Sequence, residues 1–135
     1  MDNSEYSGVI TPLVEELDQL NAKAIEIGKL IVGSTLLLVD LGFVSLLNRI
    51  VQLTDGFISM VKERNLTCAG ALLRLQLDNC MRTYALYIAA DRKEFIEALM
   101  SDKKIDDLKD KCGNAMKDWY LKSELDKFDA QFSTV

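Results

Sequence analysis

The chain of 135 residues contains no histidine. Histidine is the commonest general acid or base near neutral pH and the usual nitrogen ligand of zinc. Its absence excludes the Ser-His and Cys-His nucleophile pairs of many hydrolases. The sequence also lacks a glycine-rich phosphate loop and matches no calcium-loop spacing. No catalytic motif is complete, so we expect neither a cofactor nor a metal.

Cysteine is scarce, and its spacing is irregular. Cys68, Cys80 and Cys112 are an odd number and form no C-x-x-C pair, which argues against a disulfide framework or a zinc site. We expect reduced thiols and a cytoplasmic protein. The start, MDNSEYSG, has no positive n-region of a signal peptide. The longest apolar run, Leu30–Leu47, has Asp40 near its middle, so we expect no membrane span.

With one proline, seven glycines and little alternation of apolar and polar residues, the sequence predicts an all-α fold. We predict a single-domain antiparallel bundle of four to six helices covering residues 1–135. Its hydrophobic body is residues 11–90. Residues 91–135 form a charged cover, because 20 of these 45 residues are Asp, Glu, Lys or Arg.

Three helices are predicted in the body. The first begins at Thr11-Pro12, with a threonine cap and a proline at the first helical position, and runs to about Val32. Ser34 caps the second, which reaches about Arg64. The third, Leu66–Ala90, follows a very short turn, so it should form a hairpin with the second.

Shorter helices are predicted in the cover. Asp91 and Glu94 form a D-x-x-E capping box at the start of one helix. Two further candidates are Lys103–Lys111, stopped by Gly113-Asn114, and Tyr120–Phe132.

The third body helix is the most informative element. Its apolar side chains cover the whole circumference, which predicts a helix buried on all sides. Arg74, Asp78 and Arg82 nevertheless recur at i, i+4 and i+8 on one stripe. Three interpretations are open: an anion site in which Asp78 orients the guanidinium groups, an ion-pair network between helices, or a subunit contact. Gln76 and Asn79, on another side, are expected to hydrogen-bond across helices or to contact a partner.

The net charge of −5 argues against a general nucleic-acid binder, whose surface is basic. The charge is uneven, however. Residues 1–60 hold 3 Lys or Arg against 8 Asp or Glu, whereas residues 61–90 hold 4 against 2. Any anion site is therefore expected in the second of these segments.

The run RNLTCAGALLRLQLDNCMRTYAL (Arg64–Leu86), preceded by LLNRIVQLTDGFISMVKERN, resembles a group of bacterial helical proteins related to the HEPN-like superfamily and to abortive-infection (AbiV-like) proteins. The resemblance covers about residues 43–112. It implies an antiparallel helical bundle, often dimeric, in phage defence or toxin–antitoxin systems. It also implies a further helix after FDAQFSTV.

Active HEPN proteins resemble metal-independent RNases that use an arginine followed a few residues later by a histidine. This chain departs from that pattern, because no histidine follows Arg74, Arg82 or any other arginine. We therefore expect a non-catalytic helical interaction module that self-associates or binds a protein partner. The alternative is a HEPN-like effector that binds or cleaves RNA through Arg74 and Arg82. A third is a pocket for a small anionic ligand at the same arginines.

Overall fold

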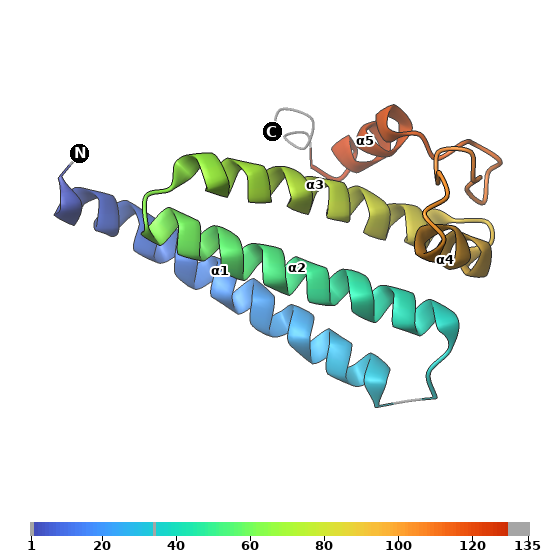
Figure 1. Ribbon diagram of the computed structural model, residues 1–135, viewed down its shortest axis with the longest axis horizontal. Coiled ribbons are helices and arrows are strands. Elements are labelled where there is room, and N and C mark those ends of the chain that lie inside the picture. Colours follow the sequence, from blue (N-terminus) through green and yellow to red (C-terminus); the bar gives the residue numbers. More distant parts are fainter. Residues whose placement is uncertain (1, 34, 130–135) are drawn as a thin grey trace. The chain divides into compact units, whose positions relative to one another are not determined.

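The computed structural model describes residues 2–33 and 35–129. In this part of the chain there are five α-helices and no β-strand, only two isolated bridges (Figure 1). The all-α class and the predicted number of helices are thus confirmed. The helices are α1 (Asn3–Val32), α2 (Leu38–Lys62), α3 (Leu66–Ile88), α4 (Arg92–Met100) and α5 (Asp118–Asp126).

The chain divides into two compact units. Unit 1 comprises residues 1–36 and 44–77, and unit 2 comprises residues 37–43 and 78–135. Both α2 and α3 contribute to each unit, so the division falls inside helices rather than between residues 90 and 91. The single domain remains a prediction, and the two units are described separately below.

Helix α1 begins nine residues before the predicted Pro12, at Asn3. The Asp2 carboxylate accepts a hydrogen bond from the Ser4 backbone N–H at 2.6 Å and caps the helix. Pro12 lies inside the helix. The turns before it are held to α2, because the Tyr6 hydroxyl donates to the Val61 carbonyl oxygen at 2.8 Å. The predicted start was therefore wrong, since contacts distant in sequence stabilise turns that a proline weakens.

Helices α2 and α3 form the predicted antiparallel hairpin. The predicted cap Ser34 lies outside the described residues, and α2 begins at Leu38, where the Asp40 carboxylate accepts from the Leu37 N–H at 2.9 Å. In the short turn, Arg64 has a positive φ of 61° and the Asn65 side chain accepts from the Cys68 N–H at 3.2 Å. The turn therefore ends one helix and caps the next.

Helix α3 is not buried on all sides, contrary to the sequence prediction. Leu66, Leu73 and Leu75 are 61, 38 and 43% exposed. Among the described α3 residues of unit 1, Ala69 alone is buried, at 3% exposed. An apolar circumference requires neighbours on every side, and the described part of unit 1 supplies them on one side.

Unit 2 has its core where the last turns of α3 meet α4. Ala85, Leu86, Phe95 and Ile96 are at most 2% exposed. The predicted cap of α4 is confirmed, because the Asp91 carboxylate accepts from the Glu94 N–H at 3.0 Å. Burial of these apolar side chains stabilises unit 2.

The predicted helix Lys103–Lys111 does not form. Residues 101–117 instead make turns and two isolated antiparallel bridges, Ala89 with Asp110 and Lys109 with Ala115. Helix α5 begins at Asp118, two residues before the predicted Tyr120, and ends at Asp126; the last three residues predicted for it, 130–132, lie outside the described residues. No helix in residues 2–33 and 35–129 is long and apolar enough to cross a membrane.

Candidate interaction surface

The predicted stripe on α3 is brought together only in part. The Arg82 Nε donates to Asp78 Oδ2 at 2.8 Å, and the two side chains are 38 and 39% exposed. Arg74 is exposed and has no ion-pair partner among the residues that the structure describes. A half-exposed i,i+4 pair contributes only a few tenths of a kcal/mol, ~0.3–0.5. Asp78 therefore already neutralises the charge of Arg82, whereas Arg74 has no such partner among the described residues.

The two predicted amides have different surroundings. In unit 1, the Gln76 amide donates to the Thr54 hydroxyl oxygen at 3.3 Å and to the Ile50 carbonyl oxygen at 3.5 Å. Of the two alternatives expected for Gln76, these contacts correspond to hydrogen bonding across helices. Asn79, in unit 2, is fully buried, and its backbone carbonyl accepts from the Thr83 hydroxyl at 2.8 Å.

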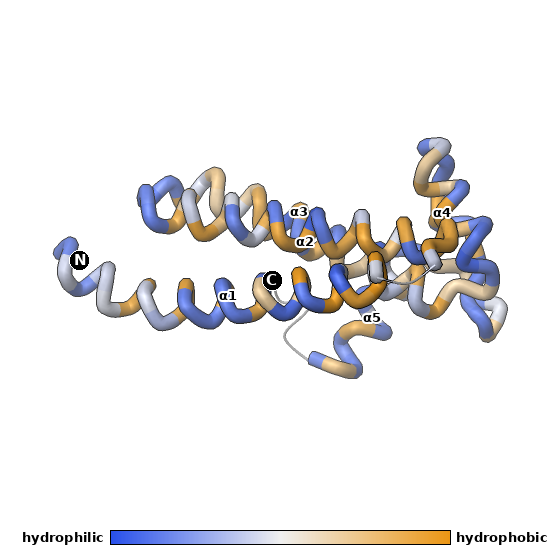
Figure 2. Tube along the Cα trace, turned by 90° about the horizontal axis from the view of Figure 1, so that it is seen from below, coloured by the Kyte–Doolittle hydropathy of each residue, from blue (hydrophilic) through white to orange (hydrophobic). Residues whose placement is uncertain are grey.

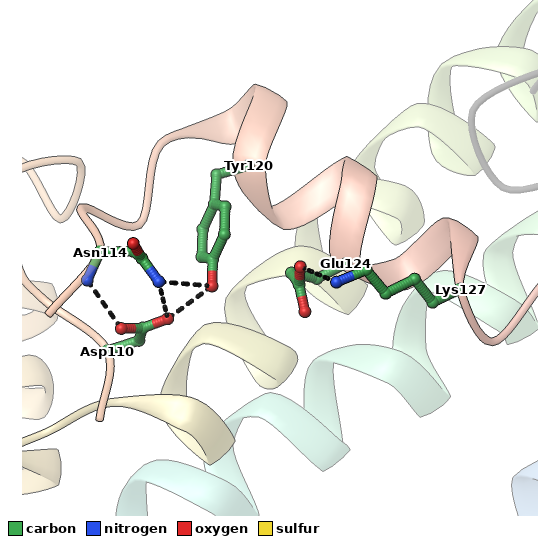
Figure 3. Close-up of polar contacts among 5 residues, drawn as sticks. All are labelled: Asp110, Asn114, Tyr120, Glu124 and Lys127. Atoms are coloured by element: carbon green, nitrogen blue, oxygen red, sulfur yellow. Dashed lines mark hydrogen bonds and ion pairs between the residues drawn. The ribbon is translucent and has the colours of Figure 1, made fainter. Parts of the chain in front are cut away.

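A polar cluster in unit 2 was not predicted. The Asp110 carboxylate is 5% exposed and accepts from the Tyr120 hydroxyl at 2.6 Å (Figure 3). It also accepts from the backbone N–H groups of Cys112 and Asn114, at 2.9 and 2.8 Å, and from the Asn114 amide at 3.3 Å. These hydrogen bonds fold the turn over Asp110 and attach it to α5. The signal in the sequence was Asp110 followed closely by Gly113-Asn114, residues typical of turns.

The cluster shifts the pKa values of its two acidic groups in opposite directions. Burial raises the pKa of Asp110, but its hydrogen bonds with Tyr120, Asn114 and Cys112 outweigh burial and leave the pKa below its ordinary value. The hydrogen bond to Asp110, assisted by burial, raises the pKa of Tyr120 to about 12. Asp110 stays ionised and Tyr120 stays protonated at neutral pH. Because both oxygens of Asp110 already accept hydrogen bonds, the cluster is suited to holding a turn rather than to proton transfer.

Beside this cluster, unit 2 has an open cleft of about 240 Å³. Tyr84, Tyr87 and Tyr120 line it together with Lys111 and Glu124.

Glu124 accepts a hydrogen bond from the Lys127 ammonium, which raises the pKa of Lys127 (Figure 3). Within the described residues, no group of three or more Cys, Asp or Glu side chains is placed to hold a metal ion.

Unit 1 exposes more apolar side chains than it buries. Among the described residues of unit 1, five apolar residues are buried, with at most 8% of each exposed: Val14, Leu46, Ile58, Val61 and Ala69. Eleven large hydrophobic residues of the same unit are exposed: Val9, Leu13, Leu20, Ile25, Ile27, Leu30, Val32, Leu36, Leu66, Leu73 and Leu75. Single exposed leucines are ordinary, but so many in one unit, several of them on one side of α1, are typical of an interaction surface.

The exposed residues of α1 are ordered along the helix. Leu13, Leu20 and Ile27 follow one another at seven-residue intervals and are 54, 52 and 50% exposed. Val9 and Leu30, 54 and 78% exposed, extend the same side of the helix at its two ends. The recurrence of hydrophobic positions along α1 can be followed in Figure 2. We call these five residues, with the intervening Glu16 and Lys23, the α1 stripe.

The α1 stripe lies about 100° around the helix from the side that packs inside unit 1. That inner side is marked by Val14 and Asn21, which are 8 and 6% exposed. The Asn21 amide donates to Asp55 Oδ1 of α2 at 2.7 Å and to the Val51 carbonyl oxygen at 3.4 Å. These polar contacts fix the rotation of α1 and leave Leu13, Leu20 and Ile27 about half exposed beside the contact with α2.

A groove of about 200 Å³ adjoins the middle of the α1 stripe. Leu17 and Leu20 of α1 form one wall, and Leu72, Leu73 and Gln76 of α3 form another. The lining is apolar apart from three side chains, Asn21, Thr54 and Gln76. A side chain from outside unit 1 can therefore pack next to Leu20 against hydrocarbon.

Comparison with known proteins identified no relative: no family model, no curated protein and no solved structure matches this chain.

Proposed function

We propose that this chain is a helical interaction module that self-associates. The observation that supports the proposal is the imbalance in unit 1, with eleven large hydrophobic residues exposed against five apolar residues buried. Association removes such surface from water at roughly 25 cal/mol per Å². A module of this kind needs neither a catalytic group nor a cofactor.

The expected setting is the cytoplasm. Cys68, Cys80 and Cys112 are free and exposed, and exposed thiols persist in a reducing compartment. The resemblance of residues 43–112 to HEPN-like and abortive-infection proteins supports a role in phage defence or toxin–antitoxin systems.

Sedimentation equilibrium of the full chain tests this proposal. We expect a reversible dimer whose weight-average mass rises with concentration through the micromolar range. A chain that remains a monomer at tens of micromolar would contradict self-association.

The alternative, an RNA-binding or RNA-cleaving effector acting through Arg74 and Arg82, is distinguished by a second measurement. The net negative charge of the chain and the pairing of Arg82 with Asp78 both disfavour RNA binding. We expect a labelled single-stranded RNA to remain unshifted and uncut at physiological salt. Binding or cleavage that is lost in Arg82→Ala, with helical content retained, would support the effector instead.

A further inference from the structure

We propose that α1 is the dimer interface and that it pairs antiparallel with α1 of a second copy about a two-fold axis beside Leu20. This inference rests on the proposed self-association and specifies its surface, partner and geometry. It is carried by the α1 stripe, whose apolar and charged residues are arranged symmetrically about its own centre.

The two charges of the α1 stripe lie at equal distances from its centre. Glu16 and Lys23 are placed symmetrically about a point between Gln19 and Leu20, and both side chains are exposed. In an antiparallel pair related by a two-fold axis, a residue before the centre lies opposite the residue equally far after it. Glu16 of one copy therefore lies opposite Lys23 of the second copy, and each dimer contains this ion pair twice.

The apolar residues obey the same symmetry. Val9 and Leu30 are equally distant from the centre. The distances of Leu13 and Ile27 from the centre differ by one residue, and Leu20 lies next to the axis. Val9 to Leu30 spans about 32 Å of helix, which is long enough for a continuous helix–helix contact. The seven-residue spacing of Leu13, Leu20 and Ile27 is the interval at which two helices stay in contact while crossing at about 20°.

A parallel pairing of α1 with itself lacks this complementarity. Each residue would then lie near its own equivalent, so that Glu16 would approach Glu16 of the second copy and Lys23 would approach Lys23. Like charges opposite one another destabilise a contact. The charge pattern therefore selects the antiparallel arrangement and the second copy as the occupant.

The groove beside Leu20 adds a packing site at the axis. Leu20 and Leu73 both line it, and the rest of the lining, from all three helices of unit 1, is mainly apolar. Because Leu20 lies next to the axis, Leu20 of each copy reaches the groove of the other. Two equivalent leucines are thus buried at the centre of the interface, where interface contacts contribute most.

Charge reversal tests the pairing. Glu16→Lys alone and Lys23→Glu alone each convert two attractive pairs into two repulsive ones, and we expect each to raise the dimer Kd about tenfold or more at low salt. The double variant Glu16→Lys/Lys23→Glu restores both pairs with their signs exchanged, so its Kd should return close to that of the wild type. These differences should shrink at high salt.

Leu20→Glu tests the axis, with Ala22→Glu as its matched control. Leu20 is 52% exposed in the single chain, so the substitution should preserve the helical content and thermal unfolding. Two glutamates beside the axis should raise the Kd about a hundredfold. Ala22 is exposed on another side of α1, and the same added charge there should change the Kd little.

The outcomes separate this inference from the proposed function. A wild-type chain that stays monomeric overturns both. If the wild type is a dimer and Leu20→Glu raises its Kd no more than Ala22→Glu does, the α1 interface is overturned. Self-association through another surface would then remain. A double charge reversal that fails to restore the dimer overturns the antiparallel pairing.

Discussion

Ile96 of α4 occupies the space that a side chain at Gly42 of α2 would need. A Cβ built at Gly42 would lie 2.1 Å from Ile96 Cδ1 and 2.8 Å from Ile96 Cγ1. Both residues belong to unit 2, and Ile96 is 2% exposed. Glycine at this position therefore permits close approach of the two helices rather than an unusual backbone conformation.

The first prediction is that Gly42→Ala destabilises the protein. The added methyl group overpacks a buried contact, and we expect the free energy of unfolding to fall by about 1–3 kcal/mol. Denaturant unfolding followed by circular dichroism measures the change. Gly28→Ala, where a Cβ would meet nothing within 4 Å, is the matched control.

Removal of the obstructing atom should rescue the variant. Ile96→Val deletes Cδ1, the atom nearest to the added Cβ. The double variant Gly42→Ala/Ile96→Val should be more stable than the two single effects predict when added together. Strict additivity would show that the two positions are not in contact.

The helices were predicted from the sequence where their signals are local. The third helix begins at Leu66 as expected, after a short turn in which Asn65 accepts from the Cys68 N–H. The Asp91 cap was predicted from its D-x-x-E spacing. The helix predicted over residues 103–111 does not form, because Asp110 forms a hydrogen bond with Tyr120, ten residues away. Alternating charges favour a helix locally, but a buried carboxylate with several donors determines the turn.

The candidate site was predicted less completely than the fold. Arg74, Asp78 and Arg82 share one helical stripe, but regular spacing does not decide which charges find partners in space. The exposure of Leu13, Leu20 and Ile27 was not predicted either. An apolar pattern shows that a side of a helix requires burial, but not whether a neighbour within the same chain provides it.

The second prediction concerns Tyr120→Phe. Loss of the hydroxyl removes a 2.6 Å hydrogen bond to the ionised Asp110, and the free energy of unfolding should fall by about 1–2 kcal/mol at neutral pH. Tyr87→Phe is the control, because Tyr87 is 61% exposed. Chemical denaturation of the three proteins measures the difference.

The effect of Tyr120→Phe should depend on pH at both extremes. The pKa of Tyr120 is raised to about 12, so the stabilisation is complete below the ordinary tyrosine pKa of about 10 and disappears as the pH rises toward 12. The pKa of Asp110 is lowered, so its contribution is present above its ordinary pKa and is lost as the pH falls through the folded-state value. A stability difference that stays constant over this range would contradict a charged hydrogen bond.

The third prediction concerns the polar contact that orients α1. Asn21→Asp is nearly isosteric, but it places a carboxylate where the amide nitrogen lies 2.7 Å from Asp55 Oδ1. Repulsion between two carboxylates raises the pKa of at least one of them. At neutral pH we expect the free energy of unfolding to fall by about 1–2 kcal/mol, equivalent to roughly one pKa unit.

Acid should reverse the destabilisation by Asn21→Asp. The two carboxylates repel each other only while both are ionised. The loss in the free energy of unfolding should therefore shrink as the pH falls through the raised folded-state pKa. The exchange variant Asn21→Asp/Asp55→Asn restores an amide opposite a carboxylate and should recover most of the stability at neutral pH. Equal destabilisation by the single and exchanged variants would show that Asn21 acts through packing alone. In that case its hydrogen bond with Asp55 would not set the rotation that leaves the α1 stripe exposed.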